Sequence, residues 1–117
     1  MLSTLAHVLT VLVALLHVWF LVLEMFLWTR PLGRKVFALT EEFAVESRDL
    51  AANQGLYNGF LAAGLFWGLY LGDAAIVSCF LICIIVAGIY GAATVSPRIF
   101  LVQAVPALAA LAAVCLT

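Results

Sequence analysis

Long runs of apolar residues constrain this chain more than any other feature. The first run covers residues 2–28 and contains one charged side chain, Glu24. A helix of about 20 residues crosses the ~30 Å hydrocarbon core of a bilayer, because each residue adds about 1.5 Å. Overall, 68% of the residues are hydrophobic and 9% are charged, against about 25% charged in an ordinary soluble domain. The sequence therefore predicts an integral membrane protein.

The apolar runs divide the chain into four predicted spans and one charged connection. The spans cover about residues 2–28, 53–71, 74–95 and 98–116, and the connection covers residues 29–52. Gly72 and Asp73 predict a tight turn, and Ser96-Pro97 predicts both a helix stop and a new helix start, with Ser96 as N-cap. Since short connections make helices antiparallel neighbours, we predict an all-α membrane protein with one transmembrane domain over residues 1–117. Its expected architecture is a compact antiparallel four-helix transmembrane bundle.

Different sequence features indicate the structure of the first apolar run and of the connection after it. The run lacks the basic start and the small-residue cleavage site of a signal peptide, so we expect it to stay as the first helix. Pro31 and Gly33 are expected to end it. In the connection, Thr40 precedes Glu41 and Glu42, an arrangement typical of a helix N-terminus. We therefore predict a short amphipathic segment at the membrane interface between the first two spans, either as a separate helix or as an extension of the second span.

All five basic residues fall on one side of the predicted bundle. Arg30, Arg34, Lys35 and Arg48 lie in the first connection, and Arg98 lies at the third. The positive-inside rule assigns this side to the cytoplasm. We therefore predict a multi-pass protein of the cell inner (cytoplasmic) membrane. Both termini are expected outside, with connections 1–2 and 3–4 in the cytoplasm.

Glycines are spaced four apart in the second predicted span. Gly55 and Gly59 form one G-x-x-x-G pattern, and Gly64, Gly68 and Gly72 continue a second one. In lipid, such spacing lets two helix backbones approach closely. Packing within one chain is the simpler interpretation, and a homodimer through these glycine-rich helix faces is the alternative.

Several classes of partner have no support in the sequence. The formal net charge of −1 gives no reason to expect a nucleic-acid partner. Cys79, Cys83 and Cys115 form no C-x-x-C pair, so they are interpreted as packing residues. His17 and Glu24 supply two metal ligands at most, whereas a stable zinc site uses three or four. No metal and no cofactor are therefore predicted.

Polar side chains gather in the cytoplasmic half of the predicted spans. His17 precedes Glu24 by seven residues, so the two lie on nearly the same face of the first helix. This half also contains Thr94 and the other candidate site residues, Asn53, Gln54, Tyr57, Asn58, Tyr90 and Gln103. A carboxylate inside a membrane is costly and usually faces a partner or a cavity. We therefore expect a polar pocket centred on Glu24 and His17 and open towards the cytoplasm.

Each of these residues also has a purely structural interpretation. Glu24 can extend to the interface or pair with a basic residue of the connection, and His17 can be a hydrogen-bonded core residue. Gln54 and Asn58 lie one turn apart and can hold helices together, at roughly 1 kcal/mol or less each. Tyr57 fits the aromatic belt found at membrane interfaces. Tyr90 and Gln103 can serve only to hold the bundle together.

Four stretches closely resemble one family of small prokaryotic membrane proteins, domain of unknown function 1304. They are EMFLW at residues 24–28, RKVF at 34–37, AANQGLYNGF at 51–60 and AGIYGA at 87–92. The resemblance covers essentially the whole chain and implies a four-helix inner-membrane protein. The family pattern often has glutamate directly before the first-helix histidine, where this chain has Leu16. That departure counts against any mechanism that needs a second membrane carboxylate.

Three functions are compatible with this pattern. The first is binding, with or without transformation, of a small apolar molecule or lipid from the cytoplasmic leaflet. In that case Glu24 and His17 would be an acid/base or orienting pair, and the amides of Gln54, Asn58 and Gln103 would orient the ligand. The second is a small proton-coupled transporter that uses Glu24, although the outer half offers few polar groups. The third is a structural or accessory membrane subunit. Membrane lipids are partners in all three cases, and the question of catalysis stays open.

Overall fold

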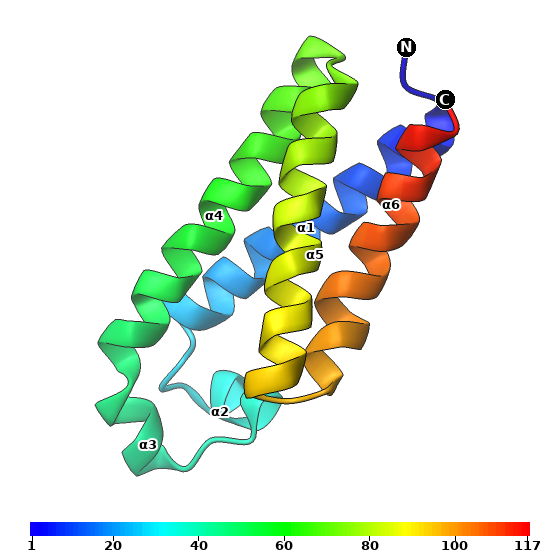
Figure 1. Cartoon of the computed structure of the whole chain (residues 1–117). Helices are drawn as coiled ribbons and strands as arrows, with labels where there is room; N and C mark the ends of the chain where they lie inside the picture. The colour runs from blue at the N-terminus through cyan, green and yellow to red at the C-terminus, as the bar shows by residue number, and fades with distance from the viewer. The chain divides into compact units, whose positions relative to one another are not determined.

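The computed structural model describes residues 1–117 and contains helices and no strands, as the sequence predicts. Its elements are α1 (Thr4–Met25), α2 (Pro31–Phe37), α3 (Glu41–Glu46), α4 (Arg48–Leu71), α5 (Ala74–Thr94), the π-helical turn η1 (Phe100–Ala104) and α6 (Val105–Cys115) (Figure 1). Contacts within the chain define two compact units. We call Met1–Leu15 with Leu61–Thr117 the terminal unit, and Leu16–Phe60 the connection unit.

Two helices, α1 and α5, are long and apolar enough to cross a membrane. Helix α4 has 24 residues and is long enough, but Arg48, Asp49, Gln54 and Asn58 make its first half polar. The last apolar helical segment, Phe100–Cys115, is shorter than the ~20 residues of a typical span. Length and composition thus give two helices with membrane character. The four-span bundle and its single-domain organisation remain predictions.

One apolar core holds the terminal unit together. Its buried residues are Leu2, Ala6, Val13, Ala14, Leu65, Val77, Leu81, Ile84, Ile85, Ala107, Ala110, Ala113 and Val114. In α5, Val77, Leu81, Ile84 and Gly88 repeat at helical spacing, so one face of this helix is buried. Helix α6 and the turn η1 contact α5, and the buried face of α6 consists mainly of alanines. Small side chains on that face let the two helices pack closely (Figure 1).

The turn between α4 and α5 confirms the prediction made for Gly72 and Asp73. Gly72 has φ +64°, a left-handed conformation that glycine adopts without strain. Backbone hydrogen bonds from Asp73 N to Gly68 O and from Gly72 N to Leu69 O close α4 in a Schellman motif. The Asp73 carboxylate then accepts from the backbone N–H groups of Ala75 and Ile76, at 2.9 and 3.2 Å. One dipeptide therefore ends one helix and begins the next.

Glycines of the terminal unit face other helices of the same chain. A Cβ atom at Gly64 would lie 2.3 Å from the Phe80 ring, and one at Gly68 would lie 2.8 Å from Val77. These glycines therefore serve packing of α4 against α5 within one chain. A homodimer through glycine-rich faces stays a prediction.

The last helix restarts at the expected place but begins with wider turns. Its Ser96 hydroxyl accepts from Arg98 N at 3.3 Å, and Arg98 and Ile99 are already helical. In η1, the Val105 N–H donates to the Phe100 carbonyl, five residues back. Pro106 follows directly and has no N–H to donate. A π-helical turn beside this proline accommodates the missing donor by shifting the hydrogen-bond register.

The connection unit differs from the prediction around Pro31. Helix α1 ends at Met25, and Pro31 starts α2 instead of only ending α1. Proline suits this first helical position, since its missing N–H would have no helical partner there. Gly33 lies inside α2, where an added Cβ would come within 1.8 Å of the Leu27 carbonyl oxygen. Glycine therefore permits a close approach of α2 to the end of α1.

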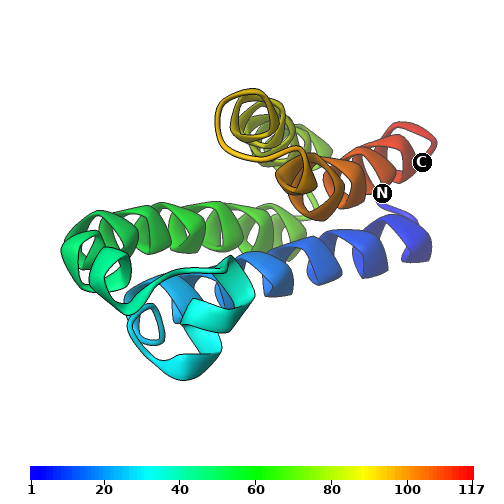
Figure 2. The same cartoon turned by 90° about the horizontal axis from the view of Figure 1, so that it is seen from below.

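The predicted amphipathic segment consists of two short helices (Figure 2). The Thr40 hydroxyl accepts from Phe43 N at 3.2 Å, which confirms Thr40 as the N-cap of α3. Ser47 separates α3 from α4, so α4 begins at Arg48, five residues before the predicted start of the second span. Residues 48–52 of the predicted connection therefore extend the helix of the second apolar segment.

Candidate functional site

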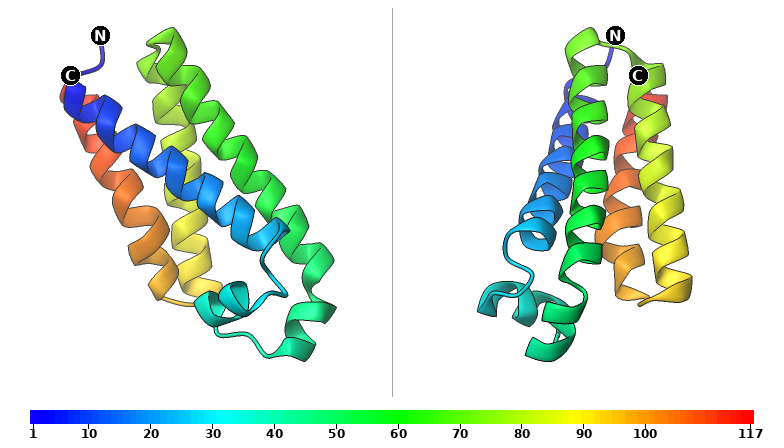
Figure 3. Two further views of the ribbon diagram at one scale, coloured as in Figure 1. Left: turned by 180° about the vertical axis from the view of Figure 1, so that it is seen from behind. Right: turned by 90° about the vertical axis from the view of Figure 1, so that its left-hand side faces the viewer.

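Within the connection unit, α1 and α4 approach each other at two glycines (Figure 3). A Cβ atom at Gly55 would lie 2.6 Å from Met25 Cγ and 3.1 Å from Glu24 Cβ. A Cβ atom at Gly59 would lie 2.7 Å from Leu21 Cδ1. The first G-x-x-x-G pattern therefore brings the two helices together within one chain, as small residues do in membrane helix pairs.

Glu24 and Asn58 meet beside this glycine contact. The side-chain amide of Asn58 donates a hydrogen bond to Glu24 Oε1. Glu24 is 9% exposed and Asn58 is 7% exposed, so both polar side chains are buried. Asn58 lies three residues after Gly55, on the same face of α4. The structure thus joins two of the residues that the sequence singled out.

Glu24 has no basic partner. The only ion pair of the chain within 4.0 Å is Arg48–Asp49, at 3.8 Å, and both of its side chains are exposed. Such an exposed pair contributes little to stability. The alternative in which Glu24 pairs with a basic residue of the connection is therefore not what the structure contains. Its partner is a neutral amide.

His17 lies on the buried side of α1. Its side chain is fully buried, seven residues before Glu24 on the same helix. The Phe20 ring packs edge-on against the imidazole, with ring centroids 5.1 Å apart. Both side chains are buried, as expected if His17 and Glu24 lie on one face of α1.

The remaining predicted residues are not gathered around Glu24 in the same way. Asn53, Gln54 and Tyr57 are exposed on α4, and the Tyr57 ring lies 6.1 Å from the Phe60 ring. Tyr90 is exposed on α5, and Gln103 is half-buried in η1. These last two residues belong to the terminal unit. Their place in a common pocket stays a prediction.

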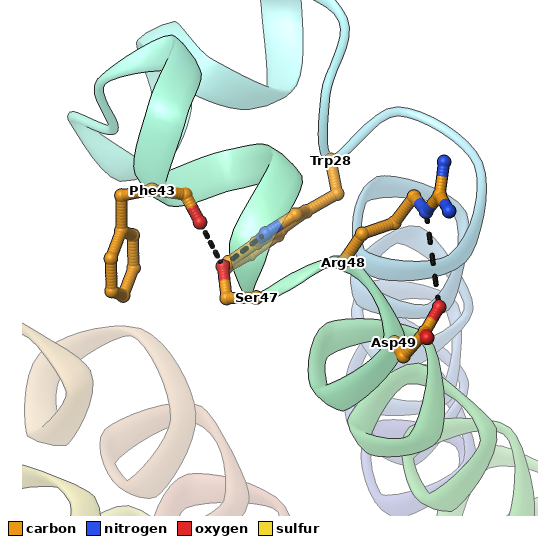
Figure 4. Close-up of polar contacts among 5 residues, drawn as sticks. All are labelled: Trp28, Phe43, Ser47, Arg48 and Asp49. Atoms are coloured by element: carbon orange, nitrogen blue, oxygen red, sulfur yellow. Dashed lines mark hydrogen bonds and ion pairs between the residues drawn. The ribbon is translucent and has the colours of Figure 1, made fainter.

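One polar contact of the connection unit was not predicted from the sequence. Trp28 Nε1 donates to Ser47 Oγ at 2.9 Å, and Ser47 Oγ donates to the Phe43 carbonyl at 2.6 Å (Figure 4). The Trp28 ring also packs on Phe37, with centroids 4.9 Å apart. Trp28 thus contacts both α2 and the end of α3. No local pattern predicts this, because Trp28 and Ser47 are 19 residues apart.

The Glu24–Asn58 pair has a defined chemical capacity. A carboxylate has two oxygens and about four acceptor positions, and Asn58 occupies one of them. The pair can therefore accept a further hydrogen bond or exchange a proton at Glu24. No group of three or more His, Cys, Asp or Glu side chains is arranged to hold a metal ion.

By its fold and its site, the chain is an all-helical protein with two strongly apolar helices and one buried carboxylate–amide pair. The chain belongs to the family described as protein of unknown function (DUF1304), whose profile matches residues 11–115. The uncharacterized protein YpaA of Lactococcus lactis subsp. lactis (strain IL1403) is 33% identical over 105 residues, which cover 86% of this chain and 88% of that protein. The family resemblance is thereby confirmed. No solved structure matches the chain.

Proposed function

We propose that this chain is an integral membrane protein that binds a small apolar molecule or a lipid beside Glu24 and Asn58. One observation carries the proposal: a carboxylate is buried near the end of an apolar helix and is held by a neutral amide. A carboxylate in a membrane is costly and commonly marks a functional site. A ligand with a hydroxyl or amine on an apolar body would match the free acceptor positions of Glu24.

The distribution of exposed side chains supports a lipid environment. On α1, Leu5, Val8, Leu12 and Leu15 are exposed at helical spacing, and Ile82, Val86 and Ile89 are exposed on α5 in the same way. Monomers in water rarely expose long apolar faces of this kind. Lipid would cover these faces without any rearrangement of the helices.

The proposed topology extends this argument to all four apolar segments. Helices α1, α4, α5 and the Phe100–Cys115 segment would each cross the inner membrane, with both termini outside. The five basic residues all fall in the proposed cytoplasmic connections or at their edges, in agreement with the positive-inside rule. Glu24 then lies at the cytoplasmic end of α1, and the ligand would enter from that leaflet.

The proposed roles follow from position. Glu24 would bind or protonate the polar group of the ligand, and Asn58 would fix the orientation of the carboxylate. His17 would act as the second acid/base or orienting group, about 10 Å further along α1 at 1.5 Å per residue. Asn53, Gln54 and Tyr57 are exposed on α4 and available to an incoming ligand.

The test compares Glu24→Gln with a matched variant, Glu46→Gln, in protein purified gently from its own membranes. Glu46 is an exposed residue of α3, so this control removes a carboxylate outside the proposed site. Native mass spectrometry with lipidomics should find one specific molecule in the wild type and in Glu46→Gln. The folded Glu24→Gln variant should lose it. Absence of any specific molecule from all three folded proteins would overturn the binding function.

A structural role is the second candidate, because Gly55 and Gly59 pack tightly against α1 on either side of Asn58. In that case the hydrogen bond only holds two helices together. Glutamine at position 24 can still accept from Asn58, so a structural role predicts wild-type stability for Glu24→Gln and lower stability for Glu24→Ala. Unfolding in detergent, followed by circular dichroism, separates this role from loss of a ligand.

A further inference from the structure

Helix α2 carries positive charge that nothing in the chain neutralises. Arg30 precedes the helix, and Arg34 and Lys35 lie in its last turn. None of the three forms an ion pair within 4.0 Å, since the only such pair is Arg48–Asp49. Three carboxylates follow closely in the sequence, in Glu41, Glu42 and Glu46, yet all are exposed and unpaired with α2. The basic residues of α2 are therefore open to a partner outside the chain.

Arg34 shows this most clearly. Its side chain is half-buried, and its Nε atom is covered without any hydrogen-bond partner. A guanidinium presents five N–H donors in a planar fork that matches the oxygens of a carboxylate or phosphate. Packing covers the Nε atom, so an acceptor from outside the chain would reach the guanidinium at its terminal amino groups.

The same helix presents an apolar stripe, with Lys35 beside it and Arg34 on the opposite side of the helix. Leu32 is 48% exposed and Val36 is 44% exposed, and the two lie one turn apart on one face. A different face of α2 attaches to the connection unit through Gly33 against Leu27 and Phe37 against Trp28. Helix α2 is therefore fixed by one face and offers Leu32, Val36 and Lys35 on another.

We propose that α2 is a binding surface for anionic phospholipid in the cytoplasmic leaflet. Lys35 binds the phosphate of a lipid whose upper acyl chain contacts Leu32 and Val36, and Arg30 and Arg34 bind headgroup phosphates on the other side of the helix. A helix with an apolar stripe on one face and basic residues around the others suits the headgroup boundary of an anionic leaflet. Charge complementarity selects this occupant, because the surface combines unpaired cations with apolar side chains. The proposal rests on the membrane location proposed above and is independent of the Glu24–Asn58 site.

The experiment offers full-length protein in mild detergent an equal mixture of phosphatidylglycerol and phosphatidylcholine, and native mass spectrometry counts the retained lipids. The wild type should retain phosphatidylglycerol preferentially. Arg34→Gln should lower its affinity about fivefold, because each basic residue near an anionic surface contributes about 1 kcal/mol. Arg48→Gln is the matched control and should keep the preference, since Arg48 lies outside α2 beside Asp49.

Two further variants keep the test informative. Arg34→Lys retains the charge and should recover most of the preference. Lys35→Gln alters an exposed residue and should weaken binding even where Arg34→Gln fails to fold, as judged by circular dichroism. Added salt should reduce the preference in the wild type, because it screens charges at the surface.

Three outcomes would overturn the lipid surface. These are equal retention of both lipids by the wild type, an equal loss in Arg34→Gln and Arg48→Gln, and full displacement of the lipid by millimolar inorganic phosphate. Membrane insertion of the wild type is measured separately by resistance to carbonate extraction. A chain that inserts without lipid preference contradicts only this inference, whereas a chain that does not insert contradicts the proposed membrane function as well.

Discussion

Asn58 and Asn53 show how one residue type has two roles on the same helix. Asn58 is buried and donates to Glu24, whereas Asn53 is exposed at the start of α4. Both amides stand in the polar stretch that the sequence marked as a site. Only an amide on the face of α4 that contacts α1 can reach the Glu24 carboxylate. The contribution of the pair can therefore be measured by the same substitution at the two positions.

At the residue scale, we predict that Asn58→Leu lowers the free energy of unfolding by about 1–3 kcal/mol, because a buried acceptor loses its donor. Asn53→Leu should change it by about 0.5 kcal/mol or less, as is usual for exposed positions. Equilibrium unfolding in detergent, followed by circular dichroism, measures both variants. Equal effects at the two positions would show that the Glu24–Asn58 hydrogen bond is not what stabilises this helix pair.

At the element scale, the end of α2 has a strained residue. Ala38 is the C-cap and adopts φ 55° and ψ 48°, the left-handed conformation that costs an L-residue about 1–2 kcal/mol. Glycine adopts this conformation freely and is common at such helix ends. The sequence offers alanine at this position, so the left-handed cap could not be predicted from it.

We therefore predict that Ala38→Gly stabilises α2 by about 1 kcal/mol, through relief of the left-handed strain. The matched variant Ala52→Gly, in the interior of α4, should destabilise by about 0.5–1 kcal/mol. Trypsin cleavage after Arg34 and Lys35 should become slower in Ala38→Gly, and unfolding measurements should give opposite signs for the two variants. Faster cleavage of Ala38→Gly would contradict the assigned cap.

At the scale of the whole molecule, the proposed orientation predicts which surfaces face each side of the membrane. In a background without native cysteines, Thr117→Cys should react with an impermeant maleimide in intact cells. Glu42→Cys, on the exposed surface of α3, should react only after permeabilisation. The physical reason is the basic first connection, which the positive-inside rule keeps in the cytoplasm. The reverse pattern of labelling would invert the proposed topology.

The sequence by itself determined the features that depend on near neighbours along the chain. Apolar runs predict α1 and α5, and short signals predict the turn at Gly72 and Asp73 and the Thr40 cap. Each of these rests on hydrogen bonds or periodicity within a few residues, so composition and spacing suffice. Resemblance to the family also follows from short stretches of sequence, and the family match confirms it.

Tertiary structure alone decided which polar residues meet. Glu24 and Asn58 are 34 residues apart, and Trp28 and Ser47 are 19 apart, so no local pattern joins either pair. Gln54 and Asn58 look alike in sequence, yet only Asn58 is buried, because it shares the face of Gly55 that contacts α1. Pro31 was expected to end a helix and instead begins one, because a turn closed by the hydrogen bond from Arg30 N to Leu27 O already separates it from α1. The physical reason is common to these cases: side-chain partners depend on how helix faces pack, and packing is set by contacts between distant segments.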